Sequence, residues 1–107
     1  MKYRDLAVNA SILCAMLTDI PEYIDGAKTL FIAKSDTSFA SVIRNNNEIL
    51  IEFIAVCQYN PKNGFYLFGC DKEFRCHTDY YYEEVDEALD DAKRIYQLED
   101  IQWTQIK

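Results

Sequence analysis

The chain has few of the residues from which active sites are usually assembled. It contains one histidine and three glycines among 107 residues. The glycines form no Gly-rich phosphate loop, and neither a G-x-S-x-G nor an H-E-x-x-H motif occurs. His77 and Asp79 could orient as a base, but no obvious nucleophile accompanies them. We therefore expect a protein that is not an enzyme, with an exposed and solvated His77.

Long apolar runs and a secretion signal are also missing. No stretch reaches the roughly 18 apolar residues that a membrane helix needs. Near the N-terminus, Asp5, Asn9 and Ser11 interrupt the apolar residues, and no small-residue cleavage site follows. We expect a cytoplasmic protein with no membrane partner.

Paired cysteine motifs are absent as well. The four cysteines are Cys14, Cys57, Cys70 and Cys76, without C-x-x-C spacing. Cys70, Cys76 and His77 could supply three metal ligands, but strand alternation puts His77 on the opposite face from Cys76. A three-residue turn would place Cys70 opposite Phe74, away from Cys76. We expect no metal, no cofactor and four reduced, buried thiols.

Basic residues are scarce relative to acidic ones. The net charge is −7 and the pI is near 4.5, which argues against nucleic acid as a direct partner and favours a basic protein. The excess is local. Residues 79–100 contain nine acids and two bases (2 − 9 = −7), and the rest of the chain contains nine of each.

Within that segment, the apolar residues predict an amphipathic helix over residues 84–97. Its apolar stripe is Val85, Ala88, Leu89, Ala92, Ile95 and Tyr96, at steps of three and four residues. Early acids and late bases suit the helix dipole. Like-charged pairs four residues apart, such as Glu87/Asp91, cost a few tenths of a kcal/mol each, and only Asp90/Arg94 is attractive at that spacing. Two interpretations stay open: a solvated face, or a docking surface for something basic.

The hairpin before the helix supplies further candidates. If Phe74, Cys76, Thr78, Tyr80 and Tyr82 face inward, then Arg75, His77, Asp79 and Tyr81 face outward. An exposed Tyr81 amid carboxylates suits a binding anchor, although it could instead pack laterally on the sheet. The predicted partner-binding residues are Asp79, Tyr81, Glu83, Glu87, Asp90 and Asp91.

The remaining pattern predicts a single α+β domain over residues 1–107. A first helix is expected at 3–18, and strands at 29–34, 38–44, 48–59, 65–70, 74–82 and 101–106. The run Asn60–Gly64 is a hairpin loop. We expect a mostly antiparallel sheet of about five or six strands, with the helices at 3–18 and 84–97 packed on it.

The C-terminal half, over about residues 60–105, contains Gly64-Phe65-Tyr66-Leu67-Phe68, Cys70-Asp71, Phe74, Thr78-Asp79, the helix Glu84–Ala92, and Trp103. In this pattern of hairpin, acidic helix and final tryptophan strand, it resembles a group of small bacterial immunity proteins. In that family a Ser or Thr usually caps the helix and Trp-His often follows the aspartate. This chain has Glu84 and Tyr81-Tyr82 instead.

The resemblance implies an immunity protein of contact-dependent growth inhibition or a related polymorphic toxin system. Such a protein binds a cognate toxin domain, often a nuclease, and neutralises it without catalysis. The acidic helix agrees independently, because a nuclease needs a basic cleft for its polyanionic substrate. The alternatives are a regulatory module for another basic partner and a small-ligand-binding domain.

Overall fold

The computed structural model describes residues 20–106, and the helix expected at residues 3–18 lies outside them. The elements of this part of the chain are β1 (Tyr23–Ile24), β2 (Ala27–Lys34), β3 (Ala40–Arg44), β4 (Asn47–Ile51), β5 (Phe53–Gln58), β6 (Phe65–Cys70), β7 (Cys76–Tyr82), α2 (Val85–Tyr96) and β8 (Thr104–Gln105). Five strands lie in the order β1-β2-β5-β6-β7, β8 pairs with β2, and the pairings are antiparallel. The prediction of an α+β fold with a mostly antiparallel sheet of five or six strands is confirmed.

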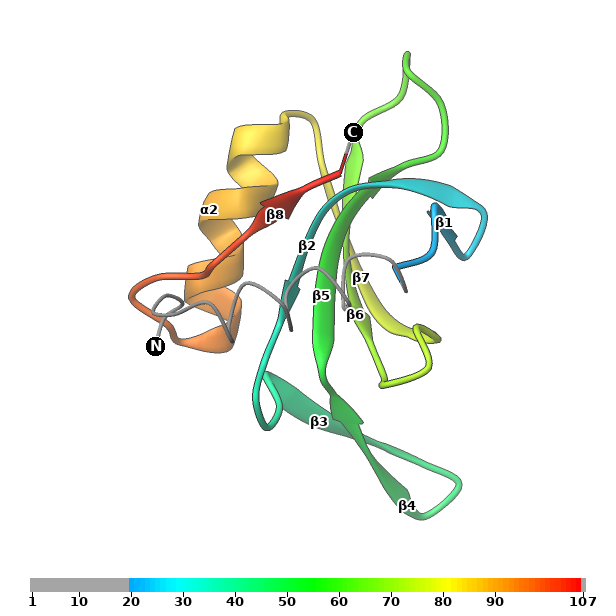
Figure 1. Cartoon of the computed structure of the whole chain (residues 1–107), viewed down its shortest axis with the longest axis vertical. Helices are drawn as coiled ribbons and strands as arrows, with labels where there is room; N and C mark the ends of the chain where they lie inside the picture. Colours follow the sequence, from blue (N-terminus) through cyan, green and yellow to red (C-terminus); the bar gives the residue numbers. More distant parts are fainter. Residues whose placement is uncertain (1–19, 107) are drawn as a thin grey trace, which may run out of the picture.

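The sheet curls, and α2 packs on one side of it, in contact with β5, β6 and β7 (Figure 1). Because side chains alternate along β5 and β6, the sheet carries two apolar clusters. We define the helix face as the side with Ile54, Val56 and Leu67, which pack near α2. The far face is the side with Cys57 and Phe68, together with Ile24, Ala27, Ile32, Phe53, Ala55 and Cys70. Both sides of β5 and β6 are therefore buried, as their nearly continuous apolar sequences require.

The prediction of one long strand over residues 48–59 is wrong. Strand β4 ends at Ile51 and pairs with β3, whereas β5 begins at Phe53 and pairs with β2 and β6. Glu52, between them, donates its N–H to the Cys70 carbonyl (2.9 Å) and accepts from the Ser35 N–H (3.0 Å). Ile51 packs on the helix face and Phe53 on the far face, although residues two apart in an unbroken strand share a face. The chain changes sheets at Glu52, and the hairpin β3–β4 projects from the main sheet (Figure 1).

The predicted alternation along the second hairpin is wrong near its turn. Strands β6 and β7 pair Gly69 with Thr78 but Cys70 with Cys76, so His77 is an extra residue that forms a β-bulge. The prediction put Cys76 and Tyr82 on the same face. Because of the extra residue, Cys76 lies opposite Cys70 and packs on the far face, whereas Tyr82 packs on the helix face. The last predicted strand is shorter than expected, because β8 pairs only with Phe31 and Ile32 of β2.

Candidate functional site

Helix α2 presents its acids to solvent because its small residues face the sheet. Ala88 and Ala92 are fully buried on the helix face, whereas Glu87 and Asp90 are exposed. The backbone N–H of Glu84 donates to the Glu87 carboxylate at 3.1 Å. This contact fixes the start of the helix without a Ser or Thr cap.

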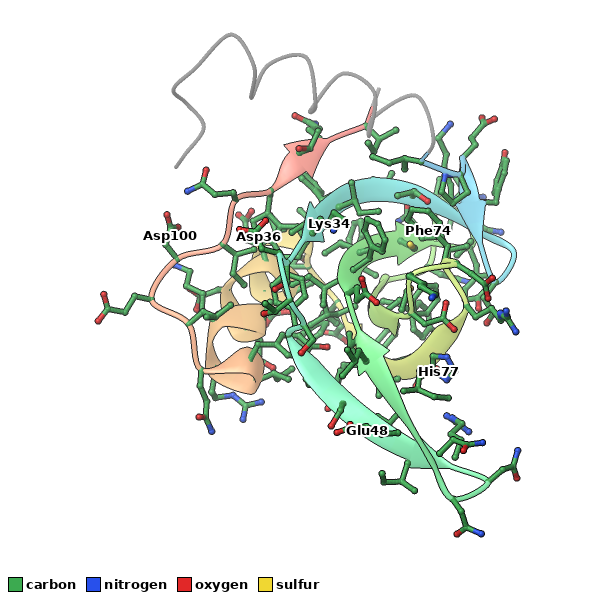
Figure 2. The ribbon with its side chains drawn as sticks, turned by 60° about the horizontal axis from the view of Figure 1, so that its bottom comes forward. Lys34, Asp36, Glu48, Phe74, His77 and Asp100 are labelled. Carbon is green, nitrogen blue, oxygen red and sulfur yellow. The ribbon has the colours of Figure 1, made fainter. Side chains whose placement is uncertain are left out.

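An open groove of about 610 Å³ lies between α2 and the segment that follows it. We name it the acidic groove. Its lining residues are Asp86, Glu87, Leu89, Asp90, Lys93, Asp100, Ile101 and Trp103. Four of these side chains are carboxylates, one is an ammonium group and three are apolar. Figure 2 shows Asp100 beside α2, on the opposite side of the molecule from His77.

Asp91 is partly exposed and is held in place by two neighbours. The Tyr82 hydroxyl donates to Asp91 at 2.5 Å, and Arg94 donates through Nε (2.6 Å) and Nη2 (3.0 Å). These bonds, from Arg94 above all and then from Tyr82, hold the pKa of Asp91 below its usual value. The expected Asp90/Arg94 pair is thus replaced by Asp91/Arg94, one residue closer in sequence. Asp91 ties β7 to α2, so it is less available to a partner than the prediction assumed.

Asp79 and Tyr81 are exposed, as predicted, but they lie on the far face. Asp79 is paired with Phe68 and Tyr81 with Tyr66, both of which belong to or pack against the far-face cluster. Helix α2 covers the other side of the sheet. The six predicted partner-binding residues are therefore not one surface.

Tyr81 combines the two interpretations that the sequence left open. Tyr81 is 55% exposed, yet its ring centroid lies 5.3 Å from that of Tyr66, which in turn lies 5.3 Å from that of Tyr59. The Tyr81 ring also covers Gly64, where a Cβ would meet the hydroxyl at 2.5 Å. Tyr81 is laterally packed on the sheet and still presents more than half of its surface to solvent.

The expectation of a solvated His77 is wrong. Its side chain is 11% exposed, and Nε2 lies 2.9 Å from the Asp71 carboxylate. The bulge is the reason, because it turns His77 toward the β6–β7 turn and away from Asp79. Asp71 also accepts the N–H groups of Glu73 and Arg75 at 2.9 and 3.0 Å. Although burial opposes it, hydrogen bonding from His77 and from the Arg75 N–H holds the pKa of Asp71 below its usual value. The His77–Asp71 pair therefore stabilises the turn between β6 and β7.

The bulge also changes which residue lies opposite Cys70. Cys70 and Cys76 lie directly opposite each other, where the sequence had put Phe74 opposite Cys70. Cys57, Cys70 and Cys76 are free thiols, and burial raises the pKa of Cys57 to about 12. Within residues 20–106, no three His, Cys, Asp or Glu side chains are grouped to hold a metal ion. Over the same residues, no helix is long and apolar enough to cross a membrane.

No protein-family model matches the sequence, and no curated protein or solved structure is significantly similar to the chain. The candidate site is therefore argued from its own residues.

Of the eight residues that line the acidic groove, only Glu87 and Asp90 are among the predicted contact residues. The helix dipole accounts for Asp86 and Lys93, and no sequence pattern connects Asp100, Ile101 and Trp103 with the helix. Helical spacing groups Asp86 with Asp90, four residues later, and Asp90 with Lys93, three residues later. Nothing in the spacing brings Trp103 and Leu89 to one groove, because the turn after α2 decides where Trp103 lies.

Proposed function

We propose that this chain is a binding protein that takes a basic partner on the outer face of α2. We further propose that it is a bacterial immunity protein, cytoplasmic and without catalytic activity, whose partner is a cognate toxin domain with a basic nuclease cleft. Three of the predicted contact residues, Glu83, Glu87 and Asp90, are exposed on or next to α2. They form the core of the proposed interface.

The observation that carries this proposal is the position of the protein's excess charge. The net charge of residues 79–100 equals that of the whole chain, −7. The structure places Glu87 and Asp90 of that segment on the solvent side of α2, around an open groove. A concentrated field of one sign accelerates the association of an oppositely charged partner and fixes its orientation.

A nuclease domain is a suitable partner because its substrate is a polyanion. Its cleft must carry positive charge, and a carboxylate-rich helix can occupy the same field. A regulatory module for another basic partner would use the same surface, so the enzymatic activity of the partner separates these two functions. The small-ligand alternative has less support. The acidic groove and the smaller depression next to Glu48 and Asp71 are both open and lined by charged residues, unlike a closed apolar pocket.

The test is a pair of charge-reversal variants with equal net charge. Glu87→Lys/Asp90→Lys changes the proposed interface, and Glu22→Lys/Glu48→Lys changes exposed acids away from α2 (Figure 2 labels Glu48, on the hairpin β3–β4). Each exchanges two carboxylates for two ammonium groups, which moves the net charge from −7 to −3 (−7 + 4). The partner in the assay is the nuclease domain of the proposed cognate toxin, and its association rate and residual activity are measured at two salt concentrations.

The α2 variant should associate more slowly, protect less well and show a flatter salt dependence than the control. The variant loses the Glu84 N–H bond to the Glu87 carboxylate, which costs about 1 kcal/mol, and it also loses the like-charged pairs Glu83/Glu87 and Asp86/Asp90, which offsets part of that cost. The fold should therefore be retained, and circular dichroism checks it. Equal binding and protection by both variants would show that the acidic face serves solubility alone.

A further inference from the structure

The acidic groove combines an apolar wall with an excess of negative charge, since four carboxylates and one ammonium group line it. Leu89, Ile101 and Trp103 line it without polar groups other than the indole N–H, and Ile101 is almost fully buried. Asp86, Glu87, Asp90 and Asp100 line it with carboxylates. A surface of this kind fits a ligand that is apolar along its length and cationic at its end.

Among residues 20–106, the carboxylates of the groove are only weakly neutralised. Lys93 approaches Asp90 at 3.9 Å, with both side chains well exposed, so this pair contributes little. Glu87 and Asp100 accept hydrogen bonds from neutral donors, the Glu84 N–H at 3.1 Å and the Gln102 amide at 3.1 Å. Arg94, which could have turned toward the groove, donates to Asp91 instead. Charge complementarity therefore calls for a cation from outside.

An arginine side chain matches each part of the groove. Its methylene stem can lie on Leu89, and its planar guanidinium can stack on the Trp103 indole. The same guanidinium can donate in a fork to Glu87 or Asp100, which a lysine ammonium cannot do in the same geometry. The groove is open to solvent, so it suits a side chain that projects from a macromolecule better than an enclosed small molecule.

We propose that the acidic groove is the anchor pocket of the interface and that it receives an arginine side chain of the basic partner. This inference rests on the proposed function, which it refines from a charged helix face to one pocket and one residue type. Trp103 is the surface on which the arginine is selected over lysine, and Glu87 and Asp100 supply the charge.

The chain offers a direct reporter, because Trp103 is its single tryptophan. The probe is a tetra-arginine peptide capped at both ends, titrated into the full-length protein while tryptophan fluorescence is recorded. A tetra-lysine peptide of equal charge is the matched ligand. We expect a saturable fluorescence change with both, and binding about threefold or more tighter for arginine.

Two double variants separate the groove from the general field. Glu87→Gln/Asp100→Asn neutralises the groove, and each amide keeps an acceptor for the Glu84 N–H or the Gln102 amide. Asp36→Asn/Glu99→Gln removes the same charge from exposed acids outside both the groove and the predicted contact residues, so both variants have a net charge of −5 (−7 + 2). We expect roughly tenfold weaker arginine-peptide binding for the groove variant and less than twofold for its control.

Calorimetry on Trp103→Leu and Trp103→Phe completes the test, after circular dichroism has shown that both are folded. Loss of the arginine preference in Trp103→Leu and its retention in Trp103→Phe support stacking on the ring. Equal weakening by the two double variants, equal affinity for the two peptides, or no saturable fluorescence change would each overturn the anchor pocket. None of these outcomes decides the proposed function, which the charge-reversal test with the nuclease domain judges separately.

Discussion

Strand β7 and helix α2 belong to one acidic segment, yet they present their charges on different sides of the molecule. The end of β7 places Asp79 and Tyr81 on the far face, next to Phe68 and Tyr66. Helix α2 covers the other face and exposes Glu87 and Asp90 around the groove.

The difference comes from the periods of the two elements. A strand sends successive residues to opposite faces, so Tyr81 and Tyr82 separate, and only Tyr82 reaches Asp91. A helix collects residues three and four apart on one side, so its acids gather. Charge that is continuous in sequence is therefore divided between two surfaces. Substitutions on one surface should therefore leave the other surface largely unchanged.

The largest expected effects concern the two apolar clusters. Phe68→Ala on the far face should lower the free energy of unfolding by about 3–5 kcal/mol, and Leu67→Ala on the helix face by about 2–5 kcal/mol, because both side chains are fully buried. Urea denaturation measures both. Leu89→Ala is the control, since Leu89 is only half-buried at the groove and should cost less than Leu67. A cost below about 1 kcal/mol for Phe68 or Leu67 would mean that its face is not a true core.

Substitution of Asp91 should affect stability more than substitution of its neighbour Asp90. Asp91→Asn should destabilise the protein by about 1 kcal/mol at pH 7, because it weakens charged hydrogen bonds to Arg94 and Tyr82 at a partly exposed site. Asp90→Asn should change stability by less than about 0.5 kcal/mol.

The Asp91 effect should also depend on pH. The folded state lowers the pKa of Asp91, so its carboxylate stabilises the fold fully above the unfolded value near 4 and loses this contribution as pH falls through the folded value. Urea denaturation at pH 7 and pH 3 should show a smaller gap between wild type and Asp91→Asn at the lower pH. A gap that grows on acidification would contradict the assigned hydrogen bonds.

Charge reversal on either surface should have a more modest effect, and the effect on partner binding should differ between the two surfaces. Asp90→Lys should weaken binding of the nuclease domain about threefold to tenfold, whereas Asp79→Lys, the same change on the far face, should leave it within about twofold. Both affinities are measured at one ionic strength. If Asp79→Lys is as damaging as Asp90→Lys, the interface extends over both faces.

The smallest expected effect is that of reducing agents, which should leave the protein unchanged. Titration of the unfolded, unreduced protein should find four free thiols, and metal analysis should find no stoichiometric zinc. In the folded protein Cys57 should react slowly, because burial raises its pKa to about 12. Fewer than four thiols would point first to Cys70 and Cys76, which lie opposite each other.

The sequence by itself determined the class of fold and the position of the charge. The period of the apolar residues gives α2 its buried side at Ala88 and Ala92, and the loop Asn60–Gly64 gives the hairpin between β5 and β6. These features are local, because hydrophobic periodicity and turn chemistry act over a few residues.

Only the tertiary structure decided which residues meet. The break at Glu52 arises because β4 pairs with β3 while β5 needs β2 and β6, and no residue in the strand marks that choice. One extra residue, His77, moves Cys76 opposite Cys70 and turns the histidine to Asp71. Trp103 comes to the same groove as Leu89 through the turn that follows α2. Such contacts depend on competition between distant strands and on single-residue register, and a one-residue shift in register changes the face of every side chain that follows.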